Sequence, residues 1–253
     1  MTLNNSINPW TSSTASHVGL VRTINEDAYL DRPDIGLWVV ADGMGGHHAG
    51  DVASSSIVQA LSDIKPDPHL SQFINQTEDR LLGINRRLRQ MADEHQDNRT
   101  IGSTVIAMLA CNHYCALLWA GDSRAYLLRD GKLSQLTRDH SQVEELVQRG
   151  LLLPEQAEMH PAANIITRAV GAGNELDIDV DLIEAKSGDT FLLCSDGLYK
   201  HVNNADLTEL LAQENLHDIT NDLINLTLER GATDNVTTVV IRYNGSELHP
   251  STN

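Results

Sequence analysis

Three short apolar runs in this chain each end at an aspartate beside a glycine. The runs are 37–43, 117–122 and 191–197, which end in Asp42-Gly43, Gly121-Asp122 and Asp196-Gly197. Short apolar runs rich in β-forming residues and bounded by Gly and Asp are typical of buried strands. A fourth acid, Asp234, stands just before the apolar run 236–241. The sequence therefore predicts four carboxylates at the ends of buried strands.

Carboxylates gathered at one edge of a core repel one another unless hard cations lie between them. Sites in which acidic side chains share divalent ions commonly act on phosphate groups. The pair Asp130-Gly131 offers an internal comparison, because strand-like sequence on both sides of it indicates an ordinary hairpin turn. After Asp42-Gly43 and Asp196-Gly197 the pattern changes instead to a loop and then a helix. Since no hairpin requires these two acids, we expect them to serve a metal site that handles phosphate.

The composition limits the partners that this chain can bind. Its 253 residues can bury a substantial core and form one large domain. Its formal net charge of −17 argues against direct binding of nucleic acid or of anionic membranes. No heptad pattern or long apolar face demands a dimer, so we expect a monomer.

Three cysteines, Cys111, Cys115 and Cys194, lie inside apolar runs, and no C-x-x-C spacing occurs. This pattern is typical of buried thiols in a reducing compartment. Residues 1–14 are polar and lack the basic start and apolar stretch of a signal peptide. No apolar run approaches the length of about 18 residues that a membrane-spanning helix needs. We therefore expect a cytoplasmic protein.

Periodic patterns of apolar residues indicate how the chain is organised. Strands are expected at 16–22, 36–41, 103–111, 113–120, 123–129, 178–184, 190–195 and 235–243. Helices are expected near 53–61, 70–95, 205–213 and 216–230, with two short helices in an inserted flap at 139–170. Many strands with helices grouped between them predict an α+β fold of two packed sheets with helices outside. Flexible ends at 1–14 and 244–253 are expected to flank a single domain at 15–243.

The segment 22–27 carries a cation and two adjacent acids after the first expected strand. Arg22 is a planar cation that can hold a phosphate group with two hydrogen bonds. Glu26 and Asp27 can bind a metal ion or the water molecules around it. Taken alone, such a segment is typical of a solvated turn, so its interpretation depends on the other motifs.

The glycine-rich segment 41–50 excludes two nucleotide-binding motifs. His48 stands where a G-x-G-x-x-G motif requires its third glycine, and no G-K-S or G-K-T occurs in the chain. His47 and His48 also lack further ligands at the spacing of a zinc site, although His47 stays a candidate because it belongs to this loop. A carboxylate such as Asp42 can bridge two cations, and Gly43 lets the backbone carbonyl come within ligand distance.

Six motifs become specific when they are taken together. They are Arg-x-x-Asn-Glu-Asp at 22–27, Val-Ala-Asp-Gly-Met-Gly-Gly-His at 40–47, Gly-Ser-Thr at 102–104, Gly-Asp-Ser-Arg at 121–124, Ser-Asp-Gly at 195–197 and Thr-Asp-Asn-Val-Thr at 233–237. In this combination the chain resembles the metal-dependent protein phosphatases of the PPM (type 2C) family, in their compact bacterial form. The resemblance covers roughly 15–243. It implies a four-layer αββα sandwich in which two mainly antiparallel β-sheets are flanked by helices, with 139–170 as the flap that shapes substrate access.

The resemblance also implies ligands for two Mn²⁺ or Mg²⁺ ions and, as in bacterial members, for a third. Asp42 would bridge the two ions, and the carbonyl oxygen of Gly43 would complete one of them. Asp196 and Asp234 would hold the first ion. Together with Asp196, Asp122 would supply the third metal position.

Further roles follow from the same motifs. Arg22 would bind the substrate phosphate, while Glu26 and Asp27 would order metal-bound water. The residues expected to support these ligands from behind are Thr104, Ser123 and Asn235. Animal members carry a histidine directly after the Asp-Gly pair as the acid for the leaving group, whereas this chain has Met44 there. Either His47 or metal-bound water would then protonate the leaving oxygen.

The implied activity is hydrolysis of phosphoserine and phosphothreonine in proteins by a hydroxide that bridges the two ions. Phosphorylated proteins would be the partners, and the reaction would reverse that of a Ser/Thr kinase. The alternative is a catalytically silent module of the same fold that binds a phosphoprotein. Such a module is expected to have lost metal carboxylates, and all of them are present here.

Two other classes fit the sequence less well. An acidic Ca²⁺-binding protein of the EF-hand type is not supported, because the spacing D-x-D-x-D-G is absent. A cysteine-based tyrosine phosphatase is disfavoured because all three cysteines lie in apolar runs, away from a glycine-rich basic loop.

Overall fold

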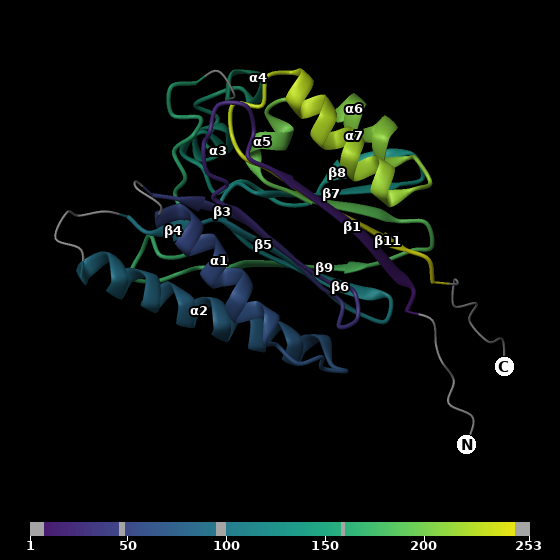
Figure 1. Ribbon diagram of the computed structural model, residues 1–253, viewed down its shortest axis with the longest axis horizontal. Coiled ribbons are helices and arrows are strands. Elements are labelled where there is room, and N and C mark those ends of the chain that lie inside the picture. Colours follow the sequence, from purple (N-terminus) through teal and green to yellow (C-terminus); the bar gives the residue numbers. More distant parts are fainter. Residues whose placement is uncertain (1–7, 46–48, 95–99, 158–159, 246–253) are drawn as a thin grey trace.

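The structure, a computed structural model, describes residues 8–45, 49–94, 100–157 and 160–245. Within these residues the strands form two sheets that stack face to face (Figure 1). The first sheet has the order β1 (Trp10–His17), β11 (Val236–Tyr243), β10 (Thr190–Cys194), β7 (Arg124–Arg129) and β8 (Lys132–Gln135). The second has the order β2 (Asp27–Arg32), β3 (Leu37–Met44), β5 (Val105–Cys111), β6 (Tyr114–Ala120) and β9 (Asp179–Glu184), with β4 (Gly102–Ser103) beside β3. Every pairing is antiparallel.

Strand β3 shows why the apolar runs are continuous rather than alternating. Successive side chains of a strand point to opposite faces of its sheet. Trp38 and Val40 belong to the core between the two sheets, whereas Leu37 and Val39 belong to the core under the helices. Because both faces of the strand are buried, each of these positions must be apolar.

Helices cover the outer face of each sheet (Figure 1). Helices α1 (Ala49–Ser62) and α2 (Leu70–Glu94) pack on the second sheet, and helices α6 (Asn204–Leu211) and α7 (Leu216–Glu229) pack on the first. The described residues form three apolar cores, one between the sheets and one under each helical layer. The predicted four-layer αββα sandwich of two antiparallel sheets flanked by helices is confirmed.

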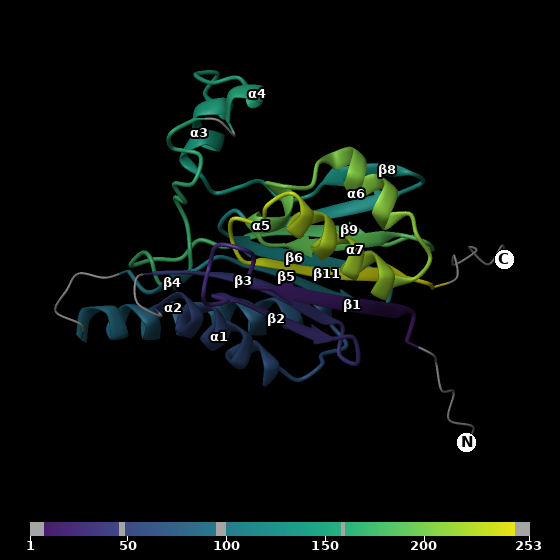
Figure 2. The ribbon, with the colours of Figure 1, turned by 45° about the horizontal axis from the view of Figure 1, so that its top comes forward.

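The inserted segment stands away from the sandwich. Figure 2 shows α3 (Gln142–Gln148) and α4 (Pro154–Ala157) projecting beyond the sheets. The two chains at its base are joined by hydrogen bonds, from Thr167 N–H to the His140 carbonyl (2.8 Å) and from Gln142 N–H to the Ile165 carbonyl (2.9 Å). The flap is therefore attached through a closed neck, which begins a few residues after β8.

The prediction of a flexible segment at 1–14 is wrong for residues 10–14, which belong to a strand. Strand β1 begins at Trp10 and pairs with β11 along its whole length, and Trp10 packs on Tyr243 with ring centroids 4.7 Å apart. The strand was missed because it is rich in Ser and Thr and shows little apolar alternation. Residues 1–7 and 246–253 lie outside the described part of the chain.

The prediction of a strand at 16–22 is wrong beyond His17, where strand β1 ends. Gly19 has a φ of +80°, and a Cβ atom there would lie 2.2 Å from the carbonyl oxygen of Asp234, so the chain turns closely around that residue. Strand β2 and the short helix α5 (Asp196–Tyr199) were not expected from the sequence. Among the described helices, each is either too short or too polar to cross a lipid bilayer.

Candidate metal centre

The ends of five elements bring five aspartates to one end of the sandwich. Asp27, the first residue of β2, is directly opposite Asp42 on β3. Asp122 follows β6, Asp196 begins α5 and is separated from β10 by Ser195 alone, and Asp234 precedes β11. Both sheets therefore contribute acids, as the positions at the ends of the strands predict.

The raised pKa values of three of these acids reflect burial and electrostatic repulsion between neighbouring carboxylates. The pKa of Asp42 is raised well above its ordinary value by burial and by the negative charges of Asp27, Asp196, Asp122 and Asp234. Burial, together with neighbouring acids, raises the pKa of Asp27 and of Asp122 to about 7. Five carboxyl groups thus share one partly buried region, where they cannot all be charged at low energy without a counter-charge.

The donor set fits hard divalent cations. One carboxylate oxygen on each of Asp27, Asp122 and Asp196 is buried without a hydrogen-bond partner. A buried anionic oxygen without a partner is unfavourable, and a divalent ion with oxygen ligands supplies the missing interaction. Within the described ranges, no three acidic, histidine or cysteine side chains are spaced to hold one ion as they stand. The chemistry of the site therefore suits Mn²⁺ or Mg²⁺, whereas the side chains are not arranged in a closed cage.

Thr104 and Ser123 connect two of the acidic positions through hydrogen bonds. The Thr104 N–H donates to the Asp42 carbonyl (2.9 Å), and the Thr104 hydroxyl accepts from the Asp42 N–H (3.1 Å). The Thr104 and Ser123 hydroxyls are 2.7 Å apart. Ser123 directly follows Asp122, so this chain of hydrogen bonds fixes the backbone at both Asp42 and Asp122.

Asn235 fixes the loop that carries Arg22 and Glu26. Its side-chain oxygen accepts from the Glu26 N–H (2.8 Å), and its amide donates to the carbonyls of Val18 (2.8 Å) and Ile24 (2.9 Å). Every polar atom of this buried side chain is used in holding the loop beside β11. A supporting role for Asn235 is consistent with these contacts.

Gly43 occupies a position that no larger residue can fill. Its N–H donates to the Glu26 carbonyl (3.1 Å), and a Cβ atom on it would lie 2.1 Å from the Gly50 carbonyl oxygen. The Glu26 carboxylate lies against the start of α1, where a Cβ atom on Gly50 would lie 2.6 Å from its Oε1. The glycine therefore allows β3, α1 and the Glu26 loop to meet at Asp42.

Two cations are paired with expected metal ligands. Arg22, whose side chain is 52% exposed, donates through Nη2 to Asp234 Oδ2 at 2.8 Å. Lys200, for which the sequence predicts no role, pairs with Asp196. Ser195 was also missed, and its hydroxyl donates to Asp27 Oδ2 at 2.8 Å. In the sequence, the one feature that could have suggested the Lys200–Asp196 pair is the spacing of four residues, which is one helical turn.

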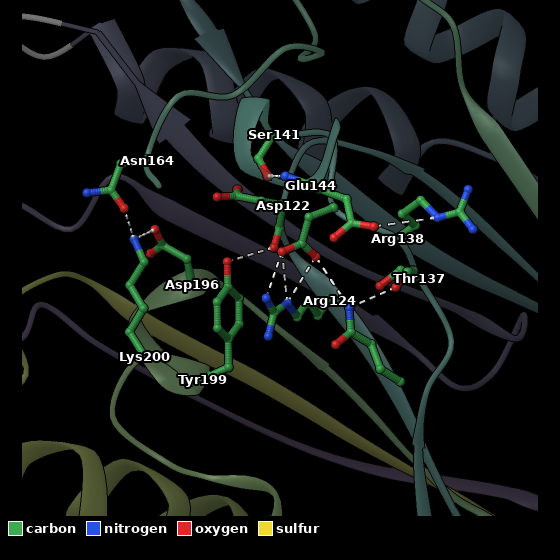
Figure 3. A network of polar contacts seen from close by, with 12 residues as sticks. Asp122, Arg124, Thr137, Arg138, Ser141, Glu144, Asn164, Asp196, Tyr199 and Lys200 are labelled. Atoms are coloured by element: carbon green, nitrogen blue, oxygen red, sulfur yellow. Dashed lines mark hydrogen bonds and ion pairs between the residues drawn. The ribbon is translucent and has the colours of Figure 1, made fainter. Parts of the chain in front are cut away.

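A second group of residues, which the sequence does not predict, contacts the backbone of Asp122 (Figure 3). The Arg124 guanidinium donates to Asp139 through Nη2 (2.7 Å) and Nε (2.9 Å), and its Cζ lies 3.6 Å from the ring centroid of Tyr199. The Tyr199 hydroxyl donates to the Asp122 carbonyl at 3.0 Å. This stack links the neck of the flap, which starts near Asp139, to the acidic cluster.

A pocket of about 670 Å³ lies between the acidic cluster and the flap. The residues that line it include Arg22, Asp122, Asp234, Lys200 and, from the flap, His160 and Asn164. The pocket is therefore open to a substrate that approaches the acids past the flap. His47, the expected candidate for the acid, lies outside the described residues, whereas Met44 ends β3 beside Gly102.

Comparison with known proteins identifies the class to which this fold and site belong. The sequence model of the protein phosphatase 2C family matches residues 21–238. The serine/threonine protein phosphatase PstP of Mycobacterium tuberculosis is 37% identical over 92% of this chain, which spans 45% of the length of that relative.

Two solved structures extend the similarity to three dimensions. PppA of Pseudomonas aeruginosa is 42% identical, with a TM-score of 0.86 over 92% of this chain and 97% of its own. The catalytic domain of PstP in complex with two manganese ions is 34% identical, with a TM-score of 0.83 over 93% of this chain and 99% of its own. The chain belongs to the protein phosphatase 2C family, and the expected family is confirmed.

Proposed function

We propose that this chain hydrolyses phosphoserine and phosphothreonine in proteins with the help of two Mn²⁺ or Mg²⁺ ions. The observation that carries the proposal is the cluster of five aspartates, three of which have a buried carboxylate oxygen without a hydrogen-bond partner, at the edge of the 670 Å³ pocket. A site of this kind binds divalent ions, and an exposed arginine beside it provides the group that recognises phosphate. Membership of a phosphatase family supports this reaction class.

Asp42, Asp196 and Asp234 are the proposed ligands of the two ions, together with the carbonyl oxygen of Gly43. Asp122 would serve a third position with Asp196. When bound, the ions neutralise the phosphate dianion and supply a hydroxide nucleophile near neutral pH. The chain's own contribution is to hold the carboxylates through backbone hydrogen bonds such as those at Asp42.

Arg22 is the proposed ligand of the substrate phosphate. Its guanidinium now neutralises Asp234, and a divalent ion at Asp234 would leave it free to turn to the phosphate. Two parallel hydrogen bonds from the guanidinium to the phosphate oxygens would orient phosphorus for in-line attack. Glu26 and Asp27 are proposed to order the water around the ions. Protonation of the leaving oxygen is assigned to His47 or to water, because Met44 cannot supply a proton.

The cysteines support a mechanism without a covalent intermediate. Burial raises the pKa of both Cys115 and Cys194 to about 12, so both are neutral thiols at physiological pH. Cys111, Cys115 and Cys194 are all free. These thiols suit a reducing compartment, and we propose a cytoplasmic monomer that counteracts a Ser/Thr kinase.

A turnover assay tests the proposal. Purified protein should release phosphate from a phosphothreonine peptide with Mn²⁺ and lose this activity with excess chelator. Asp42→Asn and Asp196→Asn should each lower kcat by at least about a hundredfold, since each removes a ligand of the ions. Folded wild-type protein that binds the phosphopeptide in the presence of Mn²⁺ but never turns it over would instead favour the catalytically silent module.

A further inference from the structure

Lys200 is placed between the acidic cluster and the flap. It follows α5, one helical turn after Asp196, and its ammonium pairs with Asp196 Oδ2. The same ammonium donates to the side-chain oxygen of Asn164 on the flap at 2.8 Å (Figure 3). A single cation therefore contacts an expected metal ligand and the flap at the same time.

The arrangement of Lys200 parallels that of Arg22. Each cation lines the 670 Å³ pocket, and each is paired with an expected metal ligand, Arg22 with Asp234 and Lys200 with Asp196. A divalent ion coordinated by both acids would take over both carboxylates. The cations would then lose their partners in the same pocket, where an incoming anion would offer them new acceptors.

We propose that Lys200 is a second cation for the phosphoryl group of the substrate, released from Asp196 when divalent ions bind. This inference rests on the proposed function. An ammonium group has three donors, and Asn164 occupies one of them. The other donors become available to phosphate oxygens once Asp196 is bound to a metal ion. The side chain of Lys200 is 35% exposed, so its ammonium can turn into the pocket without unfolding α5.

The contact with Asn164 joins the Lys200 ammonium to the flap. Asn164 belongs to the flap and lines the same pocket, and its side-chain oxygen accepts a hydrogen bond from the Lys200 ammonium (Figure 3). A lysine that served only to neutralise Asp196 would not need a partner on the flap. The pair of contacts therefore places Lys200 on the wall of the pocket that lies between the flap and the acidic cluster.

The first test uses inorganic phosphate, which is the product and carries no neighbouring peptide. Lys200→Met keeps the length of the side chain and removes its charge. Lys132→Met, on the exposed hairpin strand β8, is the matched control with the same change in net charge. For Lys200→Met, the inhibition constant for phosphate and the KM for p-nitrophenyl phosphate should rise about tenfold, as expected for a lost charge-assisted hydrogen bond. For Lys132→Met, both should stay within about twofold, the margin of a distant exposed charge.

The second test measures metal binding without turnover. Because the ammonium competes with Mn²⁺ for Asp196, Lys200→Met should bind Mn²⁺ more tightly than wild type in a calorimetric titration. A residue that merely supported the structure of Asp196 would have the opposite effect. Weaker Mn²⁺ binding by Lys200→Met, or unchanged phosphate inhibition, overturns the inference.

Failure of this inference and failure of the proposed function can be told apart. Binding of inorganic phosphate to the Mg²⁺-loaded protein can be measured calorimetrically, whether or not the protein turns over a substrate. If wild type lacks turnover but Lys200→Met still weakens phosphate binding about tenfold, the inference stands and the catalytic proposal fails. If wild type is active and Lys200→Met binds phosphate as wild type does, only the inference fails.

Discussion

Asp27 and Asp42 are paired directly across the antiparallel strands β2 and β3, at the end of the second sheet. Two acids in neighbouring backbone positions repel each other when both are charged. The hydrogen bond from the Ser195 hydroxyl to Asp27 Oδ2 stabilises one of the two carboxylates, while the other oxygen of Asp27 has no partner. The strand pairing therefore holds together two carboxyl groups that cannot both be charged at low energy until a cation binds.

This relationship predicts that Asp42→Asn stabilises the metal-free protein. The neutral amide removes an acid whose ionisation is opposed by burial and by the charges of Asp27 and Asp196, so the free energy of unfolding at neutral pH should rise by about 1–2 kcal/mol in excess chelator. Added Mn²⁺ should raise the Tm of wild type but hardly that of the variant. Thermal unfolding with and without Mn²⁺ measures both effects, and Asp63→Asn, at an exposed acid just after α1, is the control. An equal response of wild type and Asp42→Asn to Mn²⁺ would contradict the ligand assignment.

The raised pKa of Asp122 predicts how stability depends on pH. Burial and the charge of Asp196 raise this pKa from 3.8 to about 7. Below about pH 4 the folded and unfolded states are both protonated, and above it the unfolded state loses its proton first. The contribution of Asp122 to stability is therefore present at low pH and is lost as the pH rises through about 7, by at most about 1.4 kcal/mol per pH unit. Urea unfolding in chelator should show a flatter dependence for Asp122→Asn, and an unchanged slope would refute this.

The Arg124–Asp139 pair is expected to matter more for folding than an exposed ion pair. Its side chains are only 19% and 12% exposed, against 36% and 61% for the Arg32–Asp34 pair. Asp139→Asn leaves the Arg124 charge poorly paired and should lower the free energy of unfolding by about 3 kcal/mol. Asp34→Asn should lower it by less than about 1 kcal/mol. Similar losses from chemical denaturation of the two variants would argue against a structural role for the Arg124 stack.

Two glycines provide a matched test of packing at the site. Gly43→Ala would place a methyl group 2.1 Å from the Gly50 carbonyl oxygen and should separate β3 from α1, with a loss of more than about 2 kcal/mol. Gly83 lies in the middle of α2, and a Cβ atom there meets nothing within 4 Å. Gly83→Ala should therefore stabilise the protein by about 0.5–1 kcal/mol. Denaturation midpoints of both variants check this opposite pair of signs, and a stabilising Gly43→Ala would be incompatible with the close approach.

The acids at the strand ends could be predicted because their signal is local. A continuous apolar run that stops at Asp42 or Asp196 indicates a strand buried on both faces. Several such runs together predict the layers of the fold. Strand β1 could not be predicted in this way, because its Ser and Thr residues show no apolar period and its position depends on pairing with β11.

The network around Asp122 could not be predicted for a related reason. The contacts from Lys200 to Asn164 and from Arg124 to Asp139 join segments that meet only in the folded chain. No spacing rule connects Asn164 to Lys200, 36 positions later. Local patterns thus placed the acids at the ends of strands, whereas Lys200 and the hydrogen bonds around the acids required the tertiary structure.

The most direct measurement is anomalous diffraction from crystals grown with Mn²⁺. We expect two strong peaks beside the acidic cluster, with Asp42 contacting both and with Asp196 and Asp234 contacting one of them. Asp42→Asn crystals grown under the same conditions should lose at least one peak. Ordered Asp42, Asp196 and Asp234 side chains without any manganese peak among them, at a concentration that supports phosphatase activity, would contradict the account.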